Sequence, residues 1–162
     1  MKHSALELNP RNEYGQTPLH LACLWGHLHT LDLLLGHNGI DANVVDNDGD
    51  TPLHWAVQDA KYSAVCLLLN QDSVNLEIVN KKYRTPLLEA VSDGHLGIMQ
   101  RLIARGTNVK AVDNEGNNCL HLALNKDTFG SEVETIGILD KYCKDLKLGT
   151  KKGTLMWWLL VT

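Results

Sequence analysis

Thr17-Pro18-Leu19-His20 decides the fold, because the phrase returns at a fixed interval along the chain. Thr51-Pro52-Leu53-His54 and Thr85-Pro86-Leu87-Leu88 follow it at equal spacing. A degraded fourth copy, Asn118-Cys119-Leu120-His121, stands one position short of the same spacing. A fixed period in the range of about 20–50 residues is typical of stacked supersecondary units rather than of one globular core. The sequence therefore predicts a repeat solenoid.

The residues around each phrase predict a pair of short helices. Threonine before proline suits a helix entrance, since the Thr hydroxyl can cap free amides and Pro fits the first helical position. Leu19 and Ala22 lie three apart and share one helical face. Gly26 can then end the first helix in the left-handed conformation. Second helices are expected over residues 28–35, 63–69 and 96–103, each with an apolar face against the first.

Turn-forming strings join the units. Asp46-Asn-Asp-Gly49 and Asp113-Asn-Glu-Gly116 predict a hairpin finger before each phrase. Neither helix of a unit is long enough to be stable alone, so each pair must pack against the next pair.

Together the phrase, the turn and the Gly-His pairs (Gly26-His27, Gly94-His95) resemble the ankyrin repeat over Asn12 to Leu146. The resemblance implies an all-α repeat solenoid, in which helix-turn-helix units are joined by β-hairpin fingers. It also implies that His20, His54 and His121 form hydrogen bonds between repeats.

The expected domain organisation is a single array. Residues 12–148 hold four repeats, called repeats one to four below, with bounds 12–45, 46–79, 80–112 and 113–148. Residues 1–11 are either the remnant of a preceding repeat, carried by Ala5–Asn9, or an N-terminal cap. Repeat four has an insert at Asn125–Gly130, after which Ser131 and Glu134 predict a capping box and a helix to about Leu146.

Residues 149–162 form an apolar tail. The seven residues Leu155–Val161 are too few to span a bilayer, which needs about 20. The tail is expected to fold back over the open end of the stack. The alternatives are a docking peptide, an interfacial anchor or an odd terminus. The chain is expected to be a monomer, with self-association through the tail as an open alternative.

The composition indicates no catalytic or metal chemistry. The four cysteines match no metal-ligand spacing, which favours free thiols in a reducing compartment. No nucleophile, phosphate-loop or cofactor motif is found, so we expect no enzyme activity and no cofactor. A net charge of −4 gives no general attraction to nucleic acid. With no signal peptide or membrane helix visible, an intracellular location, cytoplasm or nucleus, is expected.

Resemblance to ankyrin arrays implies that the fingers and the first helices form a concave surface for another protein. We call this surface the ledge. An apolar anchor is expected in repeat one at Tyr14, Leu24 and Trp25, because exposed aromatic residues are frequent binding hot spots. The alternative is that Trp25 packs on a missing upstream repeat or on the neighbouring helix. Trp55 is interpreted as a packing residue. The further expected ledge residues are Asp48, Asp50, Gln58, Asp59, Lys81, Lys82, Arg84 and Asp93, which make the second finger acidic and the third basic.

The expected function is a non-catalytic protein-interaction module, a scaffold or adaptor segment of a larger regulatory protein. The degenerate last repeat is loosely similar to arrays in mind-bomb-type ubiquitin ligases, so a substrate-recruiting segment is the alternative. An oligonucleotide sensor that uses the basic third finger is a weaker one. Leu35 and Asn43 are also similar to ankyrin sequences hydroxylated on the hairpin asparagine; an ordinary structural Asn43 is the competing interpretation.

Overall fold

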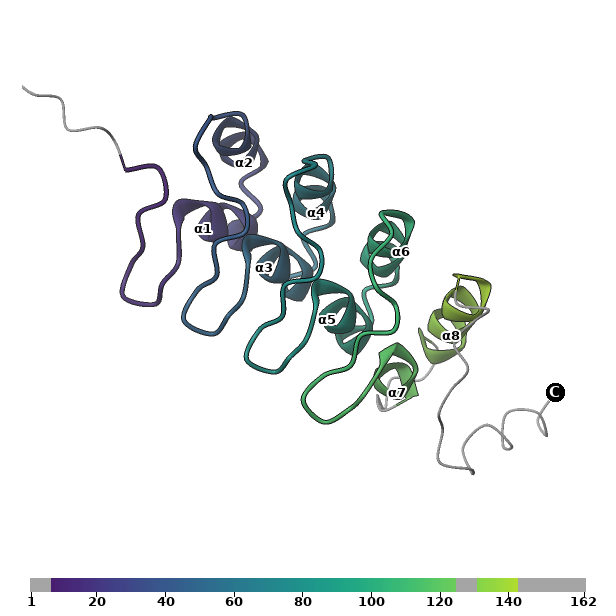
Figure 1. Ribbon diagram of the computed structural model, residues 1–162. Helices are drawn as coiled ribbons and strands as arrows, with labels where there is room; N and C mark the ends of the chain where they lie inside the picture. Colours follow the sequence, from purple (N-terminus) through teal and green to yellow (C-terminus); the bar gives the residue numbers. More distant parts are fainter. Residues whose placement is uncertain (1–6, 125–130, 143–162) are drawn as a thin grey trace, which may run out of the picture.

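The structure is a computed structural model that describes residues 7–124 and 131–142, and within these ranges it is an all-helical array (Figure 1). Helices pair in chain order, one pair to a repeat, as the repeated phrase predicted. Their bounds are α1 Pro18–Trp25, α2 Leu28–Leu35, α3 Pro52–Gln58, α4 Tyr62–Leu69, α5 Pro86–Asp93, α6 Leu96–Ala104, α7 Cys119–Leu124 and α8 Ser131–Tyr142.

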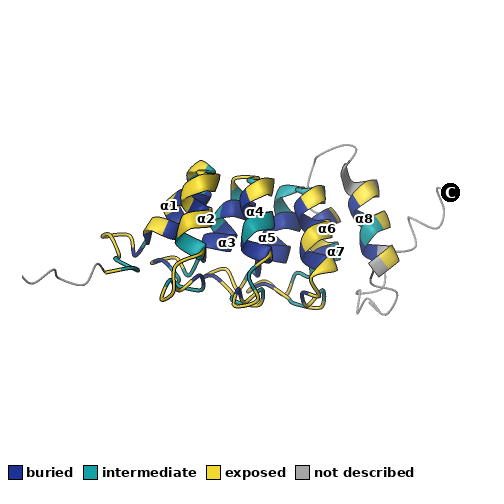
Figure 2. Ribbon diagram, turned by 90° about the horizontal axis from the view of Figure 1, so that it is seen from above, coloured by how far each residue is buried: buried dark blue, intermediate teal, exposed yellow. Residues whose placement is uncertain are grey.

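The helices form two layers. The first helices of the repeats, α1, α3, α5 and α7, lie side by side in one layer, and α2, α4, α6 and α8 form the second (Figure 1). Leucines such as Leu31, Leu53, Leu68 and Leu87 are fully buried between the layers and between successive repeats. Figure 2 shows this buried zone running along the array, with exposed residues on the outer helix faces and on the turns. Each pair is thus stabilised mainly by its neighbours.

The helix entrances follow the predicted chemistry, with histidine in a capping role. The Thr51 hydroxyl accepts a hydrogen bond from the His54 amide at 3.3 Å, and the Thr51 amide donates to His54 Nδ1 at 3.1 Å. His54 therefore takes the part that Glu or Gln plays in the usual capping box. The same amide-to-imidazole bond joins Thr17 and His20 at 3.1 Å.

The ends of the first helices need a left-handed residue. Gly26 and Gly94 supply it with φ angles of +67° and +73°. Repeat two has no glycine at this position, and Ala60 adopts a φ of +52° instead. A residue with a Cβ is strained in this region, so repeat two carries a local cost that repeats one and three avoid.

Asn9 repeats a linkage found further along the array. Asn43 bridges to the next repeat by donating to the Ser73 carbonyl at 2.7 Å and accepting from the Asn75 amide at 2.7 Å. Asn9, which stands one repeat length before Asn43, makes the equivalent bonds to the Gly39 carbonyl at 2.8 Å and the Asp41 amide at 2.9 Å. Asn9 therefore holds the same place in front of repeat one as Asn43 holds in front of repeat two.

Several expectations fall outside the described residues. These are the structure of residues 1–6, of the insert 125–130, and of the tail with its apolar run Leu155–Val161. Helix α8 begins at Ser131, as predicted, and is described to Tyr142; the expected continuation to Leu146 lies outside the described part.

Candidate partner-binding ledge

The four fingers share one turn geometry. In the second, the Asp46 amide donates to the Asp50 carbonyl at 2.9 Å, and the Gly49 amide donates back to the Asp46 carbonyl at 3.1 Å. The Asp46 side chain accepts from the amides of Asp48 and Asp50, both at 2.9 Å. Asn12, Asn80 and Asp113 do the same in the other fingers. No strand occurs in the described ranges. Each expected β-hairpin is instead a tight turn that is closed by the side chain of its first residue.

Neighbouring fingers are tied together by single backbone bonds. The Asn47 amide donates to the Tyr14 carbonyl at 2.9 Å, the Lys81 amide to the Asp48 carbonyl at 2.9 Å, and the Asn114 amide to the Lys82 carbonyl at 3.1 Å. These bonds set the fingers in a row below α1, α3, α5 and α7 (Figure 1). A row of fingers with fixed spacing can present side chains from several repeats to one partner.

Tyr83 stands where the other fingers have glycine. Its φ of +58° lies in the left-handed region, like the +76° of Gly15 and the +82° of Gly49. A bulky residue at this position could either change the turn or place an aromatic ring at the fingertip. The structure keeps the turn and exposes 63% of the Tyr83 residue. The third finger is therefore strained, because a side chain with a Cβ is held in a conformation that favours glycine.

Two of the three histidines link successive repeats, as the resemblance implied, whereas the third, His121, bonds through Nδ1 to Asn118 Oδ1 of its own repeat at 2.8 Å. His20 Nε2 lies 3.0 Å from the Asp50 carbonyl, and His54 Nε2 lies 3.0 Å from the Arg84 carbonyl. Because Nδ1 of each ring accepts the threonine amide, Nε2 is the donor in each link. Burial is the main cause that lowers the pKa of both histidines, so both are neutral near pH 7. Their place in the scaffold leaves no role for them on the ledge.

The junction between repeats three and four is built differently, and it corrects the expectation for Arg84. Leu88 replaces the linking histidine. Arg84 Nε donates to Asp113 Oδ2 across the junction at 3.4 Å, and Nη1 donates to Glu89 Oε2 at 3.3 Å. Only 20% of the Arg84 side chain is exposed, and Glu89 is buried. Arg84 thus links repeats three and four where the linking histidine is missing, and it is not a free cation of the ledge.

Two of the three residues predicted as the anchor in repeat one are exposed. Trp25 is 66% exposed and Tyr14 is 60% exposed, while Leu24 is half-buried. The residue at the Trp25 position in repeat two is Asp59, which is exposed although its repeat has a neighbour on each side. The equivalent residue of repeat three, Asp93, is half-buried, so exposure at this position varies along the array. Within the described residues Trp25 is exposed rather than packed on a neighbouring helix, and packing on an upstream repeat stays an alternative interpretation.

Trp55 shows the contrast between a packed and an exposed indole. Its Nε1 donates to Asp46 Oδ2 at 2.9 Å, and its ring meets the edge of His20 at a centroid distance of 6.3 Å. The indole therefore joins repeat two to repeat one, as a packing residue would.

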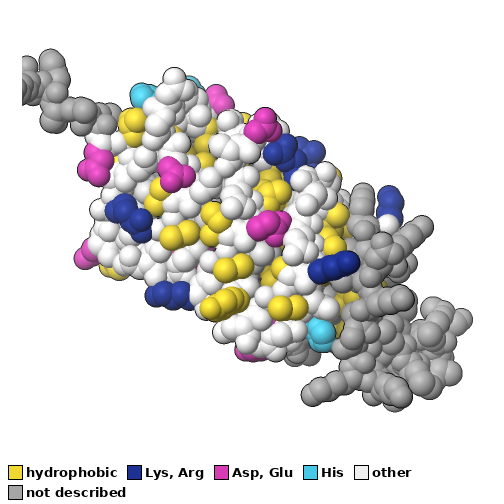
Figure 3. Space-filling view, viewed as in Figure 1, with side chains coloured by type: hydrophobic (Ala, Val, Ile, Leu, Met, Phe, Trp, Pro, Cys, Tyr) yellow, Lys and Arg dark blue, Asp and Glu magenta, His cyan; other side chains and the backbone are white. Residues whose placement is uncertain are grey.

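Charged side chains of both signs are interspersed on the face seen in Figure 3. Lys81 and Asp48 form an ion pair at 3.6 Å, in which both side chains are largely exposed. Such a pair contributes little to stability. Asp59 and Lys82 are exposed, and Asp93 is half-buried. With Arg84 turned inward, the third finger keeps two exposed lysines rather than three cations.

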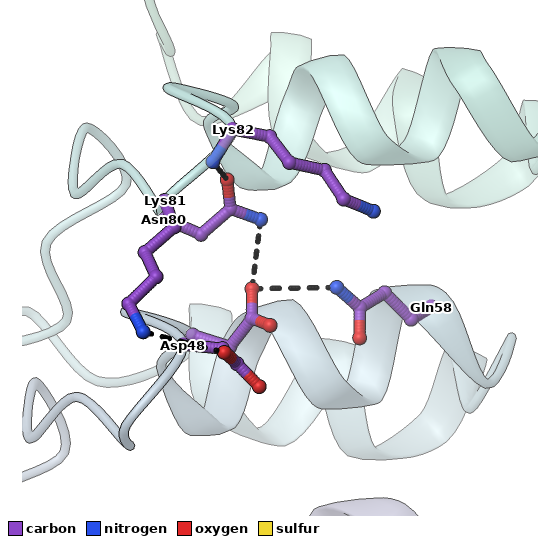
Figure 4. Close-up of a pocket in the computed structure, with 6 residues that line it drawn as sticks. Asp48, Gln58, Asn80, Lys81 and Lys82 are labelled. Carbon is purple, nitrogen blue, oxygen red and sulfur yellow. Dashed lines mark hydrogen bonds and ion pairs between the residues drawn. The ribbon is translucent and has the colours of Figure 1, made fainter.

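A polar cavity opens in this region, between α3 and the third finger (Figure 4). Its volume is about 280 Å³, and it is lined by Asp48, Asp50, Gln58, Asn80, Lys81 and Lys82. The half-buried Asp50 is its central carboxylate: Oδ1 accepts from Asn80 Nδ2 at 2.9 Å and from Gln58 Nε2 at 3.3 Å. Burial is the largest cause that raises the pKa of Asp50.

The described residues contain no cluster of three His, Cys, Asp or Glu side chains that could hold a metal ion, and no helix among them is long and apolar enough to cross a membrane. Burial raises the pKa of the Cys23 thiol to about 12, which leaves it unreactive near pH 7.

Stacked helix pairs with a row of turns define the chain as a helical repeat protein. The family model for ankyrin repeats, three copies, matches residues 2–78 and 67–139, and the chain belongs to the ankyrin repeat family. Members of this family generally mediate protein–protein interactions and are typically non-catalytic. A comparison with curated proteins finds no match.

Proposed function

We propose that this chain is a non-catalytic interaction module that binds another protein on the ledge, with Tyr14, Leu24 and Trp25 as the anchor. The single observation that carries the proposal is the 66% exposure of Trp25 on the first-helix layer. Burying an indole on binding removes a large apolar area from water, and losing such an anchor typically costs ~2 kcal/mol or more of binding free energy.

The surroundings of Trp25 support an interface rather than an isolated exposed residue. Tyr14 lies on the first finger and Leu24 precedes Trp25 on α1, so the anchor has contributions from both parts of the ledge. Exposed charged residues occur further along the ledge, at Asp59 in repeat two and Lys82 on the third finger. Protein interfaces commonly combine an apolar core with a polar rim.

A scaffold or adaptor segment of a larger protein is the role that we favour, and a substrate-recruiting segment of a ubiquitin ligase is the alternative. The two roles use the same ledge, and the identity of the partner distinguishes them. Oligonucleotide binding has less support, because Arg84 is held by Glu89 and Asp113 and Lys81 is paired with Asp48.

Affinity capture from cell lysate with mass spectrometry tests the proposal, followed by binding measurements on the purified partner. Trp25→Ala is compared with Leu33→Ala, which removes an equally exposed apolar side chain (63%) from α2 in the other layer. We expect proteins that are captured by wild type and by Leu33→Ala but lost with Trp25→Ala. Equal capture by all three forms would refute the anchor.

A further inference from the structure

We propose that the cavity between α3 and the third finger binds an arginine side chain of the protein partner, with Asp50 and Gln58 as its acceptors. The inference rests on the proposed function, since it names the chemistry of the segment that the ledge would recognise. It adds a specific pocket one repeat away from the apolar anchor.

The size of the cavity limits its occupant. Pockets for small molecules and cofactors usually measure about 300–1,000 Å³. A volume of about 280 Å³ lies at the lower end of this range, and its lining by charged and amide side chains suits the polar end of an inserted side chain. The cavity opens on the ledge between Gln58 of α3 and Lys82 of the third finger, so a chain lying along the ledge can insert a side chain into it (Figure 4).

The hydrogen bonds at Asp50 indicate a donor as the missing partner. Asn80 and Gln58 approach the carboxylate from two walls and both donate to Oδ1 (Figure 4). Two acceptor oxygens in the cavity then remain for a ligand, namely Asp50 Oδ2 and Gln58 Oε1. A guanidinium carries five donors in a planar fork and can bond two such oxygens at once, which an ammonium does less well.

Electrostatics favour the same occupant. Lys81 is already paired with Asp48, so this lysine does not serve as the counter-ion of Asp50. Asp50 is a half-buried carboxylate without a cationic partner of its own in the described part of the chain, and burial raises its pKa. A guanidinium beside Asp50 would compensate its charge. Lys82 on the opposite wall opposes any cation weakly, which gives the proposal a second testable consequence.

Nuclear magnetic resonance titration with small probes tests the cavity directly. N-acetyl-arginine methylamide is added to the folded, ¹⁵N-labelled chain, and N-acetyl-citrulline methylamide serves as its uncharged match. We expect saturable shifts of the Gln58 and Asn80 side-chain amides and of the Lys82 backbone amide with the arginine probe alone. Asp50→Asn keeps an oxygen for Asn80 and Gln58 but removes the charge, and it should weaken the arginine probe about tenfold.

Lys82→Ala provides a second test of the pocket, which remains available if Asp50→Asn does not fold. Removing this exposed cation should tighten the arginine probe about two- to threefold, whereas Lys110→Ala, a change of the same charge on an exposed residue outside the cavity, should leave it unchanged. Absence of saturable shifts, equal shifts with citrulline, or preference for N-acetyl-glutamate methylamide would each overturn the arginine pocket. If any of these results were found while Trp25→Ala still abolished capture of the partner, the arginine pocket would be wrong and the proposed function would stand. If the arginine probe bound but Trp25→Ala captured the same proteins as wild type, the anchor would be refuted instead.

Discussion

Removing the Arg84 guanidinium should destabilise the array far more than a fingertip cation could. Arg84→Met keeps the aliphatic stem and leaves Glu89 buried without its cation, and Asp113 without its link across the junction. Breaking a fully buried ion pair by removing one partner costs about 3–5 kcal/mol. Glu89 keeps a hydrogen bond from Asn80 at 2.9 Å, and Arg84 is partly exposed. We therefore expect a cost at or just below the lower end of that range, about 2–3 kcal/mol.

Urea denaturation followed by circular dichroism measures this cost. Lys82→Met is the matched control, since it removes an exposed cation from the same finger, and it should change the unfolding free energy by less than about 0.5 kcal/mol. Adding Glu89→Gln to Arg84→Met should recover about 1–2 kcal/mol, because the buried charge is then removed with its partner. Equal effects of Arg84→Met and Lys82→Met would refute the structural role of Arg84.

Four further outcomes are expected. Tyr83→Gly should stabilise the chain by about 1 kcal/mol in urea denaturation, since glycine relieves the left-handed strain and the ring is exposed; a loss of stability would show that the ring packs. Leu53→Ala should lower the unfolding free energy by ~2–5 kcal/mol, and hydrogen exchange should then show the two halves of the array unfolding separately. Trp25→Ala should lower it by less than about 1 kcal/mol, and equal losses for the two variants would contradict the anchor. Burial lowers the pKa of His54 in the folded state, so below pH 6.5 the unfolded chain binds more protons than the folded chain. The urea midpoint should therefore fall as the pH is lowered from 7 to 5.5, and a flat profile would mean that the His54 imidazole titrates freely. Incubation with an asparaginyl hydroxylase should add one oxygen at Asn43 in the intact mass if the hydroxylation hypothesis holds; an unchanged mass would leave Asn43 as a purely structural residue.

Local chemistry explains why most of the fold could be predicted from sequence. Threonine caps, prolines at the first helical turn and the three-residue spacing of Leu and Ala act within a few residues, so the helices lie where their signals stand. The helix of residues 62–69 begins only one residue before the expected start. Tyr83 and Ala60 show the limit of local rules. The four turns share one backbone conformation, and so do the three helix ends. Tyr83 and Ala60 therefore adopt left-handed φ angles that their own local preferences disfavour.

The direction of a long side chain depends on partners that are distant in sequence, and this explains the error at Arg84. Its position next to Lys81 and Lys82 suggested a solvated basic finger, but its bonding partners lie 5 and 29 residues further on. One signal was present. Glu89 occupies a position that holds Leu21 and Leu122 in other repeats, and an acid at a position facing the neighbouring repeat needs a cation. The cavity at Asp50 was also beyond local reasoning, because residues from two repeats form its walls.

The two kinds of junction differ in how freely repeats could be recombined. The histidine of repeat one or two donates to a backbone carbonyl, which every following repeat possesses whatever its side chains are. Arg84 instead requires a carboxylate at the first position of the following finger, which Asp113 supplies and which Asn12 and Asn80 would not. Repeat three can therefore be followed, without loss of this ion pair, only by a repeat whose finger begins with an acidic residue, as repeats two and four do. The array thus carries, at one joint, a rule for the order in which its modules can be assembled.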